Sequence, residues 1–140
     1  MKLIHTSPNE ITHIEPRGMF DDCLFFSTDE YVMTAKKNHV TYEMEIDEEK
    51  IISVSELYNE SIIADIMRVM NVDEDDAERM LDGRDSAFDH AGDGEDDWWL
   101  QAKQGECAKK MGYEACESRD EQGTVYIVPM FGREAELVRV

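Results

Sequence analysis

The stretch ELYNESIIADIMRVM, residues 56–70, decides the fold class, because strand-like segments lie on both sides of it. Its apolar side chains recur at intervals of three and four residues, which predicts a helix with one buried face; they are Leu57, Ile62, Ile63, Ile66, Val69 and Met70. Two more helices are expected over residues 73–81 and 97–111, because Gly83 and Gly112 stand where glycine ends many helices. In the last helix the expected buried residues are Trp98, Ala102, Ala108 and Met111.

Strand signals surround this helical middle. Residues 23–26 form a compact apolar run, and residues 40–46 alternate apolar and polar side chains as a half-buried strand does. The full set of expected strands is residues 2–5, 23–26, 40–46, 51–54, a segment near Ala115, residues 124–128 and residues 137–140. Strands at both ends around a helical middle predict an α+β fold, and 140 residues predict a single domain over residues 1–140.

Acidic residues dominate the charge, with 33 Asp and Glu against 14 Lys and Arg and a formal net charge of −19. Such a surface repels phosphate backbones, so no direct binding of nucleic acid is expected. Between Asp73 and Asp97, twelve acidic residues stand against two basic ones, a local net charge of −10. This concentration predicts docking on a basic protein surface, and the alternative is a solvated surface that keeps the protein soluble.

The cysteines and the apolar segments indicate the compartment. Cys23, Cys107 and Cys116 are odd in number and include no CxxC, so we expect reduced thiols in or near the core. No segment approaches the ~18 apolar residues of a membrane span, and the N-terminus lacks the apolar region of a signal peptide. A soluble, cytoplasmic protein without a membrane partner is therefore expected.

Three polar segments carry the candidate chemistry: HTSP at residues 5–8, STDEY at residues 27–31 and DEQGT at residues 120–124. The first begins with His5, which ends the first expected strand. The second follows a buried strand, and Ser27 with Glu30 forms a capping-box pattern that predicts a short helix carrying Tyr31. The third is an acidic turn before a late strand. Histidine, tyrosine and acid in this order resemble the His-Tyr-acid pattern of ADP-ribosyltransferases.

The amino-acid sequences of these and two further segments narrow the resemblance to one family. HTSPNEIT (5–12), LFFSTDEYVMTA (24–35), HVTY (39–42), DEQGTVY (120–126) and AELVRV (135–140) are similar to the anti-CRISPR ADP-ribosyltransferases that act on type I-F CRISPR systems. The resemblance implies a split β-sheet core with a helical middle. Residues of about 60–107 carry little of the similarity, so an acidic helical region that varies within the family is expected there.

The resemblance also implies an activity and a partner. Enzymes of this family cleave NAD, which is their substrate, and attach ADP-ribose to a protein. The implied target is the large subunit of the type I-F surveillance complex, at an asparagine side chain in its DNA-recognising region, and the modified complex fails to bind DNA. The setting implied is the cytoplasm of a bacterial host, with the protein encoded by a phage or mobile element.

The resemblance assigns roles to individual residues. Cleavage of the bond between nicotinamide and ribose develops oxocarbenium character at the sugar, so the site must orient the ribose and place negative charge beside it. His5 would hydrogen-bond the ribose hydroxyls, the backbone of Thr6 would hold the nicotinamide amide, and Tyr31 would stack on the nicotinamide ring. Ser27 and Thr28 would support the cofactor, and Asp120 would supply the catalytic acid.

The acidic position departs from the superfamily pattern. Many transferases have a catalytic Glu directly before a Tyr on the late strand, whereas here Val125 precedes Tyr126. The acidic role therefore moves upstream to Asp120, with Glu121 and Gln122 as alternatives. No GxGxxG, Walker, HExxH or EF-hand motif is present, so neither a Rossmann or P-loop nucleotide site nor a metal is expected.

Two readings other than a transferase are open at this point. The acidic surface is compatible with a non-enzymatic inhibitor that imitates DNA, or with an interaction module without catalysis. Neither of these needs His5, Tyr31 and Asp120 in this order, which favours the NAD-dependent transferase.

Overall fold

The computed structural model describes residues 1–7, 23–28, 40–120, 123–130, 133 and 136–139, whose strands form two sheets. One sheet has the strand order β1-β3-β7, and the other has the order β2-β6-β5-β4. The strands of the first sheet are β1 (Lys2–Ser7), β3 (Val40–Glu45) and β7 (Val138–Arg139), all antiparallel. Those of the second are β2 (Cys23–Phe26), β6 (Gly123–Pro129), β5 (Ala115–Asp120) and β4 (Ile51–Ser53), with β4 parallel to β5.

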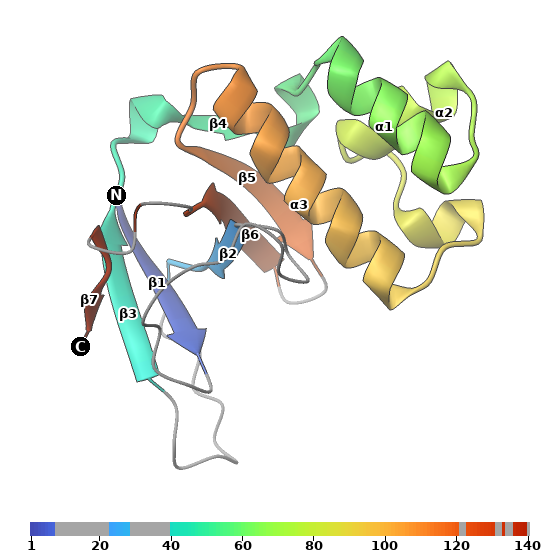
Figure 1. Cartoon of the computed structure of the whole chain (residues 1–140). Helices are drawn as coiled ribbons and strands as arrows, with labels where there is room; N and C mark the ends of the chain where they lie inside the picture. The colour runs from blue at the N-terminus through green and yellow to red at the C-terminus, as the bar shows by residue number, and fades with distance from the viewer. Residues whose placement is uncertain (8–22, 29–39, 121–122, 131–132, 134–135, 140) are drawn as a thin grey trace.

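Three helices follow β4 and cover one face of the four-stranded sheet: α1 (Glu60–Met70), α2 (Glu74–Leu81) and α3 (Gly94–Lys110). Figure 1 shows α3 lying along the sheet, with α1 and α2 farther out. Short 3-10 helices, η1 (Glu48–Lys50), η2 (Val54–Glu56) and η3 (Ala87–His90), join these elements. The α+β fold with a helical middle is confirmed.

Two apolar clusters fill the spaces on either side of the four-stranded sheet. The cluster under the helices joins Ile62, Ile63 and Ile66 of α1 to Ile52, Cys116 and Ile127 of the sheet. The cluster between the two sheets contains Leu3, Phe26, Met44, Ile46, Tyr126, Val128 and Met130. Because both faces of the sheet are buried around β2 and β6, these two strands are continuous apolar runs, whereas β5 alternates buried and exposed residues beyond Cys116.

Side chains at the helix ends explain where each helix begins and stops. Asn59, Asp73 and Asp93 cap α1, α2 and α3, each accepting a hydrogen bond from a backbone N–H of the first turn. Gly83 and Gly112 follow α2 and α3 with φ of 83° and 92°, a conformation that favours glycine. Both glycines therefore end helices as expected.

Several expected boundaries need correction. The first strand continues to Ser7 rather than ending at residue 5, so His5 and Thr6 lie within β1. The first helix begins at Glu60 rather than at residue 56, because η2 occupies Val54–Glu56 and Asn59 is the cap. For the same reason the strand expected at residues 51–54 ends at Ser53. The third helix begins at Gly94 rather than at residue 97, because Asp93 caps it.

The buried face of α3 also differs from the expectation. Ala102 and Ala108 are buried as predicted, but Trp98 is 41% exposed and Met111 is 36% exposed. The buried face contains Leu100, and Trp98 lies two residues earlier, a rotation of about 200° around a helix. Met111 is the C-cap residue, beyond the last turn of α3. The short helix expected around Tyr31 lies outside the described residues.

Candidate functional site

The middle of β1 and the residue directly after β2 meet where the two sheets join. Ile4 N donates to Ser27 O at 2.7 Å, and Ser27 N donates to Ile4 O at 2.8 Å. Because this bridge is antiparallel, His5 and Thr6 of β1 run alongside Phe26 and Phe25 of β2, whereas Thr28 runs toward Leu3. The bridge therefore brings His5 next to Ser27, more than twenty positions away in sequence, and Thr6 and Thr28 lie in opposite directions from it.

The third segment reaches this region from the four-stranded sheet. Asp120 is the last residue of β5 and pairs with Gly123 of β6, and β6 lies between β5 and β2. Tyr31 and the alternative acidic positions Glu121 and Gln122 lie outside the described residues. Their roles stay predictions.

The ring of His5 has a defined hydrogen-bonding state. Its Nδ1 lies 2.7 Å from the carbonyl oxygen of Phe25, and a carbonyl only accepts, so Nδ1 carries the proton. Burial lowers the pKa of His5 from 6.5, against the opposing effect of the Phe25 bond. The imidazole is therefore neutral near pH 7, and its Nε2 is a hydrogen-bond acceptor.

A row of side chains extends from His5 across the four-stranded sheet. The His5 ring packs on Phe26 with 5.4 Å between centroids, and Phe26 pairs with Tyr126, which pairs in turn with Glu117. Burial raises the pKa of Tyr126, and the charge of Glu117 and a hydrogen bond to it raise this pKa further. Glu117 was not predicted from the sequence. The one signal that could have indicated it is the alternation of side chains between the two faces of the strand over residues 115–120.

The opposite face of the same sheet borders an open depression of about 830 Å³. It lies between the ends of β2 and β5 on one side and α3 with η3 on the other, and Phe25, Gly94, Trp98, Gln104 and Arg119 are among its lining residues. Phe25 packs against the helical cluster, whereas Phe26 belongs to the cluster between the sheets. Strand β2 thus separates the depression from His5.

Comparison with known proteins identifies the family. Residues 1–132 match the family model described as anti-CRISPR type I-F ADP-ribosyltransferase AcrIF11. The chain belongs to this family. A solved structure titled "Crystal structure of an anti-CRISPR protein" is similar, with a TM-score of 0.60 and 25% identity over 99% of this chain and 93% of that chain. Among curated proteins, none matches the chain.

Membership makes the chain an ADP-ribosyltransferase with an anti-CRISPR role, as the sequence predicts. It implies NAD as a substrate and a protein target in a CRISPR system. In the part of the transferase that the structure describes, no helix is long and apolar enough to cross a membrane.

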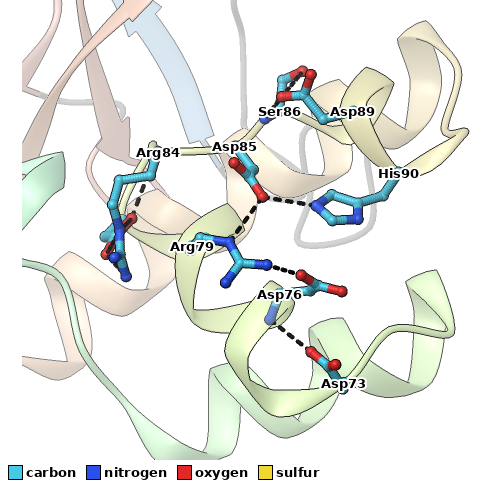
Figure 2. A network of polar contacts seen from close by, with 9 residues as sticks. Asp73, Asp76, Arg79, Arg84, Asp85, Ser86, Asp89 and His90 are labelled. Atoms are coloured by element: carbon cyan, nitrogen blue, oxygen red, sulfur yellow. Dashed lines mark hydrogen bonds and ion pairs between the residues drawn. The ribbon is translucent and has the colours of Figure 1, made fainter.

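The acidic middle of the transferase contains a network that resembles a metal site. Ligand atoms of Asp76, Asp85 and His90 lie within 4.8 Å of one another. Figure 2 shows Arg79 between the two carboxylates, bonded to Asp76 and, at 3.1 Å, to Asp85. A cation would compete with the guanidinium for both, and the hydrogen bonds from His90 and Arg79 hold the pKa of Asp85 below its usual value. The arrangement works as an ion-pair network.

Many acids of the transferase's middle have structural roles. Asp73 and Asp93 cap helices, Asp89 bonds the backbone N–H of Ser86, and Asp96 bonds that of Asp93. Carboxylates near helix N-termini also stabilise the helix dipole. The concentration of acids is therefore explained in part by capping.

Two cysteines of the transferase are core residues rather than nucleophiles. Cys107 and Cys116 are free and buried. Burial raises the pKa of Cys107 to about 11 and that of Cys116 to about 12, so both stay protonated at neutral pH. Reduced core thiols, as predicted, account for both, and the side chain of Cys23 lies outside the described part.

Proposed function

We infer that this transferase cleaves NAD at the junction of its two sheets and transfers ADP-ribose to the large subunit of the type I-F CRISPR surveillance complex. The modified group is proposed to be an asparagine side chain in the DNA-recognising region, and its modification blocks DNA binding. The observation that carries the proposal is the neutral His5, which keeps an acceptor nitrogen next to the bridge between Ile4 and Ser27, in a chain of this family.

The backbone geometry supports a role for each residue at the junction. Ile4 points its N–H and C=O toward Ser27, and strand periodicity directs those of Thr6 to the same edge of β1. A donor and an acceptor on one residue are what a carboxamide requires, so Thr6 is proposed to hold the nicotinamide amide. His5 Nε2 accepts from a ribose hydroxyl, and Ser27 and Thr28 support the sugar and phosphates.

Two further residues complete the proposed site. Tyr31 stacks on the nicotinamide, since an aromatic face gives a ring-sized contact. Asp120 provides the carboxylate that acts on the cationic sugar or on the acceptor. Intact-mass measurement of the surveillance complex after incubation with NAD tests the whole proposal: one added ADP-ribose on the large subunit supports it, and an unchanged mass contradicts it.

Alanine at His5 or at Tyr31 should weaken NAD binding. Loss of the stacking ring costs roughly 1 kcal/mol, about a fivefold rise in the Kd, and loss of the His5 acceptor costs a similar amount. Calorimetric titration with NAD measures both. Tyr58→Ala is the matched control, because Tyr58 is an exposed tyrosine before α1. Unchanged NAD affinity in both site variants, or an equal loss of affinity in the control, would contradict the proposed roles of His5 and Tyr31 in NAD binding.

NAD affinity should depend on pH through His5. Protonation turns Nε2 from an acceptor into a donor, and burial places the folded pKa below 6.5. Affinity should therefore be constant above pH 6.5 and fall at lower pH, with a midpoint below 6.5. The stability that neutral His5 contributes is likewise present above 6.5 and lost as the pH falls through the folded pKa.

Titrations of NAD at several pH values between about 5 and 8 check this dependence. His5→Gln keeps an acceptor that does not titrate, so its affinity should stay flat over the same range. A midpoint above 6.5, or the same fall in His5→Gln, would contradict the role of His5.

A further inference from the structure

Gln104, one of the residues that line the depression, has a buried carbonyl oxygen for which the described part of the chain offers no partner. Gln104 of α3 is 4% exposed, and its Nε2 donates to the carbonyl oxygen of Met80 at 3.2 Å. Since that carbonyl only accepts, the orientation of the amide is fixed, and Oε1 must point elsewhere. Among the described residues Oε1 has no hydrogen-bond partner. A buried unsatisfied carbonyl is costly, so this oxygen favours a ligand that donates an N–H.

The rim of the depression adds aromatic surface. Phe88 of η3 is 60% exposed and Trp98 of α3 is 41% exposed, and both side chains line the depression. Large exposed aromatic side chains at a concave site are typical of binding surfaces. They favour a ligand group that is flat and stacks on rings.

The charge of the lining is negative. Asp85 and Asp97 contribute two carboxylates, whereas the side chains of Glu117 and Arg119 alternate onto the Tyr126 face of β5. Asp85 is paired with Arg79 and His90, whereas the contacts of Asp97 are with neutral donors, Ala87 N and Gln101 Nε2. A nucleotide diphosphate would bring like charge to these carboxylates, so the lining disfavours NAD and favours a cation.

We propose that this depression binds an arginine side chain from a basic segment of the protein target. A guanidinium is flat, always charged and carries five N–H donors, so one group can stack on Trp98, pair with Asp97 and donate to Gln104 Oε1. A volume of about 830 Å³ also accommodates residues that flank the arginine. The proposal rests on the proposed function, because the target supplies the arginine.

The position of the depression relates it to transfer. Arg119, which lines it, directly precedes Asp120 in β5. A target segment anchored in the depression therefore lies next to the strand end that carries the proposed catalytic carboxylate. This anchoring would place an acceptor side chain a few residues away within reach of the sugar.

A titration of the full, 15N-labelled chain tests the proposal without using transferase activity. The probes are N-acetyl-arginine amide, N-acetyl-lysine amide and NAD, and the reporters are the indole N–H of Trp98 and the side-chain amide of Gln104. The arginine probe should shift both reporters in a saturable way with a Kd on the order of a millimolar, and the lysine probe should bind several-fold more weakly.

Three outcomes would overturn it: no saturable shift with the arginine probe, equal affinity for the lysine probe, or tighter binding of NAD at these two reporters. Failure of the proposed function is tested separately, by the affinity of NAD for the wild-type chain and the His5 variant. If NAD did not bind at His5, the affinity of the arginine probe for the depression would be unaffected.

Paired variants identify the recognising atom. Gln104→Met keeps the volume but removes the unpaired carbonyl, and should weaken the arginine probe about tenfold. Lys109→Met introduces the same residue at an exposed position of α3 outside the lining, and should change affinity by less than about twofold. Equal losses in the two variants, or none in Gln104→Met, would contradict the role of Gln104.

Discussion

Replacing Asp120 by Asn is expected to lower the rate of ADP-ribose transfer by about a hundredfold or more while leaving NAD affinity nearly unchanged. Positive charge on the sugar develops only as the nicotinamide bond breaks, so a carboxylate beside it stabilises mainly the transition state. Asn keeps the shape and removes the charge, which separates electrostatics from packing. The measurement is target modification at saturating NAD, with calorimetry for NAD affinity.

Two neighbouring acids are the controls for this prediction. Glu121→Gln alters the adjacent residue of the same turn, and Glu117→Gln alters the carboxylate that bonds Tyr126 on β5. Both variants should keep most of the activity. An active Asp120→Asn together with an inactive Glu121→Gln or Glu117→Gln would move the catalytic role to that residue, and full activity in all three would remove these acids from the mechanism.

The second large effect is on stability. Ile66→Ala should lower the free energy of unfolding by about 2–5 kcal/mol, because Ile66 is fully buried in the cluster that joins α1 to the sheet. Val69→Ala on the same helix is the matched control, since Val69 is 49% exposed and its truncation removes little packing. Urea denaturation followed by circular dichroism measures both. A loss below about 1 kcal/mol for Ile66→Ala would show that α1 is not part of the cooperative core.

Local patterns predicted the helical middle well. The apolar periodicity of residues 56–70 correctly identified Ile62, Ile63 and Ile66 as buried but wrongly included Val69, which is 49% exposed, and Gly83 and Gly112 marked two helix ends. The exact starts were missed because caps at Asn59 and Asp93 outweigh the apolar pattern. Trp98 was misplaced because a tryptophan reads as a core residue until the neighbours on its face are known.

At the candidate site, contacts between residues far apart in the sequence limited what could be predicted. His5, Ser27 and Thr28 were found from short sequence words, but nothing local predicts the bridge of Ile4 to Ser27 or the Phe25 carbonyl that fixes the tautomer of His5. The depression was not predicted, because its lining comes from β2, η3, α3 and β5. Its unpaired Gln104 oxygen follows from packing, and a lone glutamine in a helix carries no signal of this kind.

The parallel pairing of β4 with β5 has a consequence for how this enzyme can diversify. Ile51 pairs with Ala115 and Ser53 with Glu117, so the chain leaves the sheet at one strand and returns at the adjacent one. The helical segment therefore leaves at Ser53 and returns at Ala115, two points on adjacent strands that differ by one strand spacing, about 4.8 Å, and by two residues along the strand. An excursion of another length can be joined to the same ends, provided it covers Ile52, Cys116 and Ile127 with apolar side chains. The residues proposed to contact the arginine, Asp97, Trp98 and Gln104, all lie within this segment, whereas the proposed NAD site around His5 lies outside it, so the two can change independently.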